Sequence, residues 1–135
     1  MRAAVVGLAL AVVPMTGCGG AARAEGPQTV NITIHHSRFV PSALHVRPGA
    51  TVRFVVRNTD PIEHEFIVGD EATQQLHEVG TDTLHQGPGA VSVRAGTTAQ
   101  TTYTLPTSGS LLFGCHLPGH WAYGMRGTIT IAASA

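Results

Sequence analysis

Short apolar segments with a two-residue period are the feature that most limits how this chain can fold. Val30, Ile32 and Ile34 alternate with polar residues, and residues 52–56 repeat the pattern. Side chains two positions apart lie on the same face of a strand, so each segment is typical of a strand with one buried face. Similar segments follow, separated by Pro, Gly and Ser turns: AVSV, TTYTL, SLLFGC and GTITI. About seven short strands without a long helical pattern predict an all-β Greek-key β-sandwich.

The composition supports one turn-rich domain. The chain has 135 residues, of which 43% are hydrophobic and 12% are charged, with 16 Gly and 8 Pro. That profile suits a β protein with a single core. The net charge is zero, and the eight basic residues are all arginine and form no run. Nucleic-acid binding needs clustered positive charge, so we expect no nucleic-acid partner, and we expect a monomer.

Residues 1–17 are predicted to be a signal peptide. Arg2 precedes an uninterrupted apolar run over residues 3–13, which is too short to cross a bilayer but suits the core of such a peptide. The following PMTGC resembles a bacterial lipobox, in which the cysteine is lipidated and becomes the mature N-terminus, although Met15 stands where Leu is usual. Cleavage after the ARA sequence at residues 22–24 is the alternative, and it would give a freely secreted protein.

The lipobox interpretation divides the chain into three parts. Residues 1–17 are removed, residues 18–28 form a lipidated N-terminus with a flexible tether, and residues 29–135 form the folded domain. Lipidation of Cys18 predicts a lipoprotein in the periplasm or on the outer face of the cytoplasmic membrane. Because Cys18 is used as the anchor, Cys115 has no partner for a disulfide, and a bound metal is the simplest occupant of its thiol.

One stretch breaks the strand pattern. Residues 69–90 (GDEATQQLHEVGTDTLHQGPGA) form an insertion between strands. Asp70 is a suitable N-cap for a short helix to about Val79, and Gly80 is a suitable stop. Loops of this length in compact domains are often functional.

The segment GCHLPGHWAYGM contains three side chains that suit a soft metal. Leu111, Phe113 and Cys115 alternate onto one face, which places the thiol at the end of a core strand. A turn at residues 118–119 brings His120 back toward it, and a second short loop returns Met125. One thiolate, one imidazole and one thioether suit copper cycling between Cu(I) and Cu(II).

A trigonal site of two histidines and one cysteine needs another imidazole, and His64 in NTDPIEHEFIV is the best donor. It starts a strand after a turn that contains proline. If Phe66 and Val68 face the core, His64 faces the same way and meets the loop that carries Cys115.

The pattern of His64, Cys115, His120 and Met125, followed by GTITI, resembles the type 1 copper site of the cupredoxins. The segment RFVPSALHVRPGATVRFVVRNTD also resembles the early strands of that family. The resemblance implies a cupredoxin-like sandwich with one copper, in which His64, Cys115 and His120 are equatorial ligands and Met125 is the long axial ligand. It also implies a carrier of single electrons that performs no bond chemistry and is therefore not an enzyme. Glu65 departs from the family pattern, and we expect it to face solvent.

Other interpretations of the same residues remain open. Cys115 is alternatively a buried free thiol or a zinc ligand, although Met is a poor zinc ligand. CHLPGHWAYGM also resembles a segment of the multicopper oxidases, but Gly114 precedes the cysteine, His-x-His pairs are absent, and the chain is too short for several such domains. His116 points to the other side of the strand from Cys115. We expect it to be exposed to solvent or to lie beside the site without binding the metal.

The remaining histidines and aromatic residues give weaker predictions. His77 and His85, with Glu71 and Glu78, are candidates for a second metal site, against the default of a solvated loop. Three further histidines are expected on strand surfaces: His35, His36 and His45. The side chains around His120 are expected to dock transient redox partner proteins: Leu117, Pro118, Trp121 and Tyr123.

Two functions follow from these residues. The first is a type 1 copper protein that carries single electrons between redox partners outside the cytoplasmic membrane. The alternative is an extracytoplasmic copper-binding protein for buffering or resistance, which the histidines and glutamates of the insertion favour.

Overall fold

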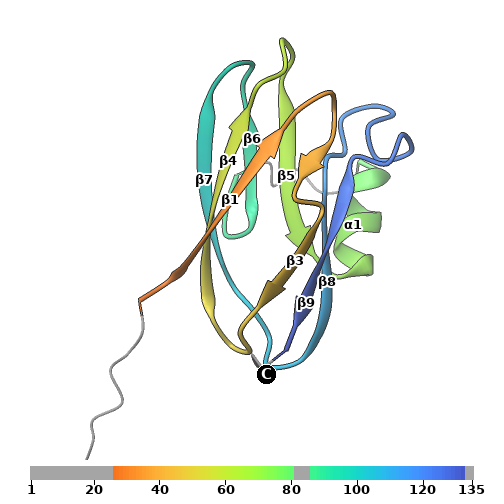
Figure 1. Ribbon diagram of the computed structural model, residues 1–135. Helices are drawn as coiled ribbons and strands as arrows, with labels where there is room; N and C mark the ends of the chain where they lie inside the picture. Colours follow the sequence, from red (N-terminus) through yellow and green to blue (C-terminus); the bar gives the residue numbers. More distant parts are fainter. Residues whose placement is uncertain (1–25, 81–85, 133–135) are drawn as a thin grey trace, which may run out of the picture.

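Two β-sheets pack face to face in the computed structural model, which describes residues 26–80 and 86–132 (Figure 1). The first sheet has the strand order β2-β1-β4-β7, and the second has the order β3-β9-β8-β5-β6. The strands are β1 (Gln28–Ile34), β2 (Phe39–Val40), β3 (Ala43–Val46), β4 (Thr51–Asn58), β5 (His64–Gly69), β6 (Ala90–Val93), β7 (Thr98–Thr104), β8 (Gly109–Gly114) and β9 (Arg126–Ile131). The predicted all-β sandwich is therefore confirmed. The predicted signal peptide and Cys18 lie outside the described residues.

The described part contains more strands than the sequence pattern suggested, because one early segment is shared between the sheets. β2 pairs with β1 in the first sheet, whereas β3 pairs in parallel with β9 in the second. Pro41 and Ser42 lie between β2 and β3, and proline has no backbone N–H to donate to a ladder. The chain crosses from one sheet to the other at this point.

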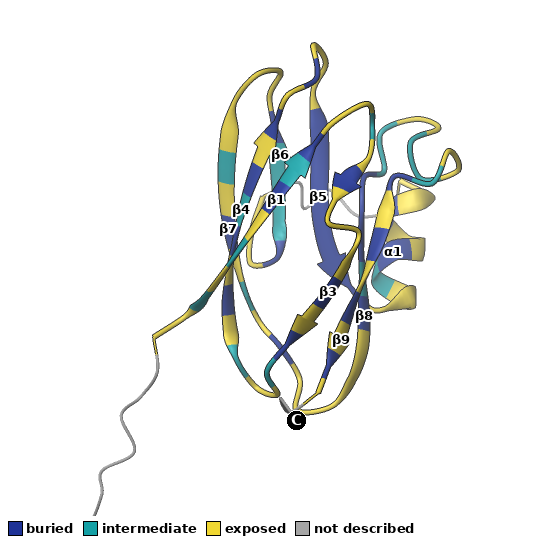
Figure 2. Cartoon of the chain, viewed as in Figure 1, coloured by how far each residue is buried: buried dark blue, intermediate teal, exposed yellow. Residues whose placement is uncertain are grey.

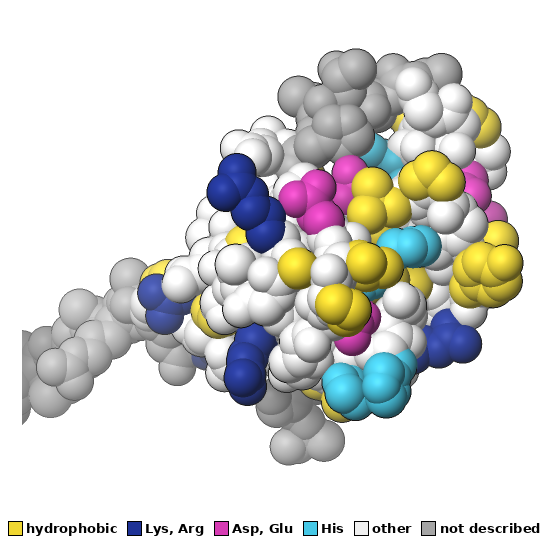
Figure 3. All heavy atoms as spheres, turned by 90° about the horizontal axis from the view of Figure 1, so that it is seen from above, with side chains coloured by type: hydrophobic (Ala, Val, Ile, Leu, Met, Phe, Trp, Pro, Cys, Tyr) yellow, Lys and Arg dark blue, Asp and Glu magenta, His cyan; other side chains and the backbone are white. Residues whose placement is uncertain are grey.

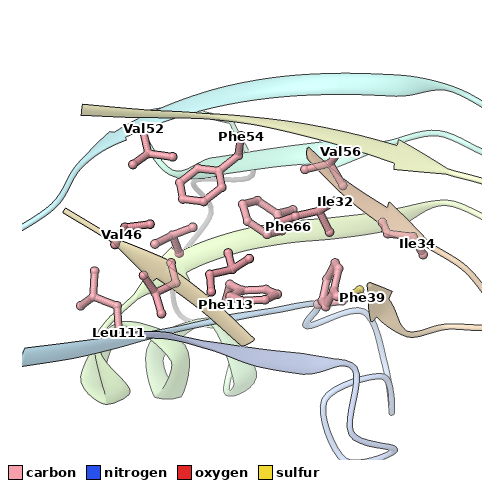
Figure 4. Packing of buried hydrophobic residues seen from close by; sticks show 14 of the residues in the cluster. Ile32, Ile34, Phe39, Val46, Val52, Phe54, Val56, Phe66, Leu111 and Phe113 are labelled. Carbon is pink, nitrogen blue, oxygen red and sulfur yellow. The ribbon is translucent and has the colours of Figure 1, made fainter. Parts of the chain in front are cut away.

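The core lies between the sheets and is formed by the alternating positions. On β1 and β4, Ile32, Ile34, Val52, Phe54 and Val56 are at most 1% exposed. Four phenylalanine rings fill the centre with centroids 5.2–5.7 Å apart (Figure 4): Phe39, Phe54, Phe66 and Phe113. Burial of each such side chain contributes roughly 1.5–3 kcal/mol.

Strand β5 is buried along its whole length (Figure 2), unlike its alternating neighbours. It lies inside the second sheet, between β8 and β6. One face of β5 meets the core, and helix α1 (Glu71–Glu78) packs on the second sheet at β5 and β8. His64, the first residue of this strand, is consequently fully buried.

Helix α1 confirms the short helix predicted in the insertion. The Asp70 carboxylate accepts a hydrogen bond from the Thr73 backbone N–H at 2.8 Å, and Gly80 follows the helix with φ +69°. Gln74 is 2% exposed, and its amide nitrogen donates to the carbonyls of Ile67 and Leu112 at 3.2 and 3.3 Å. The helix is thus fastened to β5 and β8 by a buried side chain.

Within residues 26–80 and 86–132, no helix is long and apolar enough to cross a membrane.

Candidate metal centre

Three donor atoms meet at one end of the sandwich. His64 begins β5, and Cys115 directly follows β8, which is the antiparallel neighbour of β5. In an antiparallel pair, the start of one strand lies beside the end of the other. The nitrogen and sulfur donors of His64, Cys115 and His120 all lie within 4.8 Å of one another. The Nδ1 atoms of the two histidines are 3.3 Å apart, and Cys115 Sγ is 3.2 Å from His120 Nδ1.

The loop between β8 and β9, residues 115–125, is called the cysteine loop below. It folds back on itself and brings its side chains together. The Cys115 N–H donates to the Met125 carbonyl at 3.1 Å, and the Met125 N–H donates to the His120 carbonyl at 3.0 Å. The His120 N–H donates to the Leu117 carbonyl at 2.9 Å, which closes the turn through Gly119. Met125 is fully buried in the same hydrophobic cluster as Cys115. The residues predicted as ligands therefore lie at one end of the molecule.

Asp60 fixes the orientation of His64. Its carboxylate accepts hydrogen bonds from His64 Nε2 at 2.9 Å and from the backbone N–H groups of His36 and Ser37 at 2.7 and 2.8 Å. Burial opposes ionisation, but these backbone and side-chain hydrogen bonds outweigh it and hold the pKa of Asp60 below its ordinary value. Because an ionised carboxylate only accepts, His64 Nε2 carries the proton. The Nδ1 lone pair is left to face the other two donors.

His64 is held neutral in this arrangement. Burial lowers the pKa of His64 below its ordinary value, and the neighbouring His120 lowers it further, against the opposing effect of Asp60. A neutral imidazole with one free nitrogen is the form that binds a metal.

Burial raises the pKa of the Cys115 thiol to about 11, although backbone N–H groups of Glu65 and Leu117 partly offset the effect. The Glu65 N–H lies 3.3 Å from Sγ and donates to it. At neutral pH the metal-free side chain is therefore a thiol, and a metal must displace its proton.

The donor set suits a soft metal ion. Metal–ligand bonds of about 2.0–2.3 Å to nitrogen and sulfur place trigonal donors about 3.5–3.8 Å apart. The observed separations of 3.2 and 3.3 Å need only small adjustments. One thiolate and two imidazoles, beside a buried thioether, are ligands that soft transition metals prefer.

The expectation that Glu65 faces solvent is wrong. Glu65 is 5% exposed and pairs with Ser92 of β6. The prediction assumed that one face of this strand is solvated, whereas β5 is buried on both faces. The backbone of Glu65 also contributes directly to the site through its hydrogen bond to Cys115 Sγ.

His116 is not exposed to solvent, so that part of its prediction is also wrong. Its side chain is 2% exposed, and its ring stacks on Trp121 with centroids 4.7 Å apart. Gln74 accepts from His116 Nε2 at 2.7 Å, since the amide nitrogen of Gln74 already donates to two carbonyls. His116 Nδ1 lies 2.9 Å from a carboxylate oxygen of Glu78. His116 thus connects the cysteine loop to helix α1.

The possible second metal site is only partly described. His77 is 8% exposed, and its ring stacks on that of His116 with centroids 5.7 Å apart. His77 therefore lies on helix α1 and packs against the cysteine loop, whereas the default interpretation placed it in a solvated loop. His85 lies outside the described residues. His35, His36 and His45 are exposed, as expected, but the first two lie in the turn after β1.

The residues predicted to dock redox partners differ in exposure. Tyr123 is 78% exposed and Pro118 is exposed. Leu117 is half-buried and packs against the core. Trp121 is half-buried above Gly114, where an added Cβ would lie 2.3 Å from its ring. Trp121 is therefore packed inside the molecule to a greater extent than the sequence suggested. The docking of redox partners at these residues stays a prediction.

Two residues that support the site escaped the sequence analysis. Asp60 lies four residues before His64, but its role depends on a turn at residues 36–37 that is distant in the sequence. Gln74 is an ordinary polar residue of a short helix, and only its position beneath His116 makes it important. The spacing of Asp60 and His64 in NTDPIEH was the one available signal.

The sequence and the fold both resemble those of known copper proteins. The sequence matches the cupredoxin-like domain family over residues 7–131. It is 38% identical over 118 residues to the copper-resistant cuproprotein CopI of Rubrivivax gelatinosus, across 84% of this chain and 70% of that protein. Auracyanin A of Chloroflexus aurantiacus superposes with a TM-score of 0.63 at 25% identity, covering 79% of this chain and 100% of that one. Auracyanin of Roseiflexus castenholzii superposes with a TM-score of 0.66 at 21% identity, covering 80% and 100%, a likeness of fold alone.

We predict that the metal-free protein loses stability between pH 9 and 11. The pKa of Cys115 is raised from 9.0 to about 11 in the folded state, so folding favours the protonated thiol. This contribution is fully present below pH 9 and disappears as the pH rises through 11, a loss of about 2–3 kcal/mol. Urea unfolding of the reduced protein at several pH values measures it. The chain has no lysine to titrate in this range.

Cys115→Ala is the matched control for this pH dependence. It lacks the titrating group, so its free energy of unfolding should change much less between pH 9 and 11. An equal loss in the variant and in the natural protein would assign the effect to other groups.

We predict that Asp60→Ala lowers the affinity for Cu(I), used as a soft-metal probe, by about 10- to 100-fold. The substitution removes the acceptor that orients His64 and holds the turn at residues 36–37. Competition with a chelator of known affinity measures the change. Asp70→Ala, which removes the helix cap, should lower stability but leave Cu(I) affinity unchanged. Equal affinities in the two variants would contradict the positioning role of Asp60.

Proposed function

The chain belongs to the cupredoxin-like family, and from that premise we propose that it is a type 1 copper protein that carries single electrons between redox partners. The observation that carries the proposal is the convergence of one thiol and two imidazole nitrogens within 4.8 Å at a buried end of the sandwich. Copper is the metal that fits this donor set and this family. When bound, it supplies a one-electron couple between Cu(I) and Cu(II).

We assign the ligands as His64 Nδ1, Cys115 Sγ and His120 Nδ1, with Met125 as a weak axial ligand. Each is held by the fold before a metal arrives. His64 is fixed by Asp60, Cys115 Sγ receives the Glu65 N–H, and the backbone of Met125 is hydrogen-bonded to both Cys115 and His120. Donors fixed in this way rearrange little when the charge at the site changes, which favours rapid electron transfer.

Exposure differs between the two imidazoles, which suits an electron carrier. His64 is fully buried, whereas His120 is half-buried at the surface beside the exposed Pro118 and Tyr123. An imidazole that reaches the surface gives the electron a short path to a partner. We also propose, from the family to which the chain belongs, that the protein is not an enzyme. We further propose export and lipidation at Cys18, on the basis of the sequence.

A second candidate function is copper handling, meaning buffering or resistance. Its support is the similarity to proteins named copper-resistant cuproproteins, of Rubrivivax gelatinosus at 38% identity and Pseudomonas aeruginosa at 27% identity. The insertion with His77 and His85 is where further copper would bind.

We predict an intense visible thiolate-to-copper absorption band in the Cu(II)-loaded protein. Cys115→Ser should abolish the band, because serine oxygen does not replace the thiolate. Met125→Gln is the matched control: it removes the thioether but leaves the thiolate, so the band should persist. A band that survives in Cys115→Ser, or is absent from the natural protein, would overturn the ligand assignment.

Copper stoichiometry distinguishes the two candidate functions. A carrier should bind one copper per chain tightly and give fast, reversible voltammetry. His77→Gln combined with His85→Gln should then leave the stoichiometry at one. Additional copper that is lost in the double variant would support copper handling instead, and elemental analysis after gel filtration measures the ratio.

A further inference from the structure

A cavity of about 390 Å³ opens beside His120, at the same end of the sandwich as the metal centre. Its walls are two turns that are far apart in the sequence. One turn contributes His36, Ser37 and Arg38, and the other contributes Pro118, His120 and Tyr123. Figure 3 looks onto this end, where hydrophobic, histidine and acidic side chains lie across the face and arginine side chains lie around its edge.

Arg38 is seated in this cavity by specific contacts. Its guanidinium donates to the carbonyl of Tyr123, and it packs over Gly124, where an added Cβ would lie 2.9 Å from Nη1. Gly124 therefore leaves the space that the guanidinium occupies. Across residues 26–80 and 86–132, Arg38 forms no ion pair. Arg38 is thus held beside the half-buried His120 without an ion-pair partner among the described residues.

The turn that carries Arg38 is fixed to the metal centre. His36 and Ser37 have positive φ angles of 49° and 52°, which are costly for residues other than glycine. The Asp60 carboxylate holds both of their backbone N–H groups and also holds His64. The turn that leads to Arg38 is therefore tied to the metal centre by one buried side chain.

The polar groups in the cavity are mainly hydrogen-bond donors. Arg38 has N–H groups only. If Nδ1 of His120 binds the metal, as in the proposed function on which this step rests, the other ring nitrogen carries a proton and donates. Tyr123 and Ser37 add hydroxyl groups, which donate as well. The guanidinium opposes a metal cation here, and none of the described residues that line the cavity is acidic. The Asp60 carboxylate is buried and already accepts three hydrogen bonds.

We propose that this cavity binds the carboxylate of an aspartate or glutamate side chain on a partner protein. The planar guanidinium of Arg38 can donate two parallel hydrogen bonds to the two oxygens of a carboxylate. The bound side chain places the partner's surface against His120, where an electron enters or leaves. Such a charge-complementary contact raises the association rate and selects partners that carry an acidic residue at the docking point.

The test uses the copper-loaded full chain in the Cu(I) state, which is diamagnetic and suits NMR. Amide resonances are followed during titration with N-acetyl-glutamate amide at constant ionic strength. Its neutral analogue, N-acetyl-glutamine amide, is the matched ligand. We expect saturable shifts at residues 36–38 and 119–124 with the glutamate ligand and none with the glutamine ligand.

Arg38→Gln should weaken binding of the glutamate ligand by about tenfold or more, and Arg38→Lys should weaken it less, because the charge remains. Arg53→Gln, at an exposed arginine of β4, should bind as the natural protein does. Equal binding of the two ligands, unchanged affinity in Arg38→Gln, or shifts at other residues would overturn the proposal. Free acetate that binds as tightly as the glutamate ligand would also overturn it, since the cavity would then be a general small-anion site.

A portion of each protein is oxidised to the Cu(II) state, and its thiolate-to-copper band is recorded in parallel. Arg38→Gln should retain the band, because Arg38 is not a ligand. Loss of carboxylate binding with an intact band therefore tests the cavity alone. A natural protein without the band would instead count against the proposed function.

Discussion

The antiparallel pairing of β5 with β8 is the contact on which the site depends. It places the first residue of one strand beside the residue that follows the other, so the backbone N–H of Glu65 reaches the sulfur of Cys115 across 50 positions of sequence. The long loop to β9 then needs to supply only His120 and Met125 from a short stretch. The geometry of the centre is therefore a property of the sheet, and the loop completes it.

Two groups of buried contacts hold the metal centre in place, one through Asp60 and one through His116. Asp60 joins His64 to the turn after β1, which belongs to the first sheet. His116 joins the cysteine loop to helix α1 through Gln74, and its ring is stacked on Trp121. Both groups of contacts involve buried polar side chains whose hydrogen bonds are satisfied, which favours a single arrangement of the site. The insertion thus supports the cysteine loop, in addition to any role in binding metal.

The sequence predicted the elements that follow from local rules. Alternation in β1 and β4 identified the core faces, and the cap at Asp70 identified the helix. It was wrong about Glu65 and about the exposure of His116, because alternation indicates a solvated face only where nothing covers the sheet. The covering element here is a helix of eight residues whose packing direction has no local signature.

The sequence by itself determined the sandwich, the short helix and the candidate metal-binding side chains, because strand period, capping and ligand chemistry are carried by neighbouring residues. Only the tertiary structure decided which polar residues support or adjoin those side chains. Asp60, Gln74 and Arg38 acquire their roles from contacts with segments distant in the chain. The physical reason is that burial and hydrogen-bond satisfaction depend on what packs against a residue, and that is fixed by the pairing of whole strands.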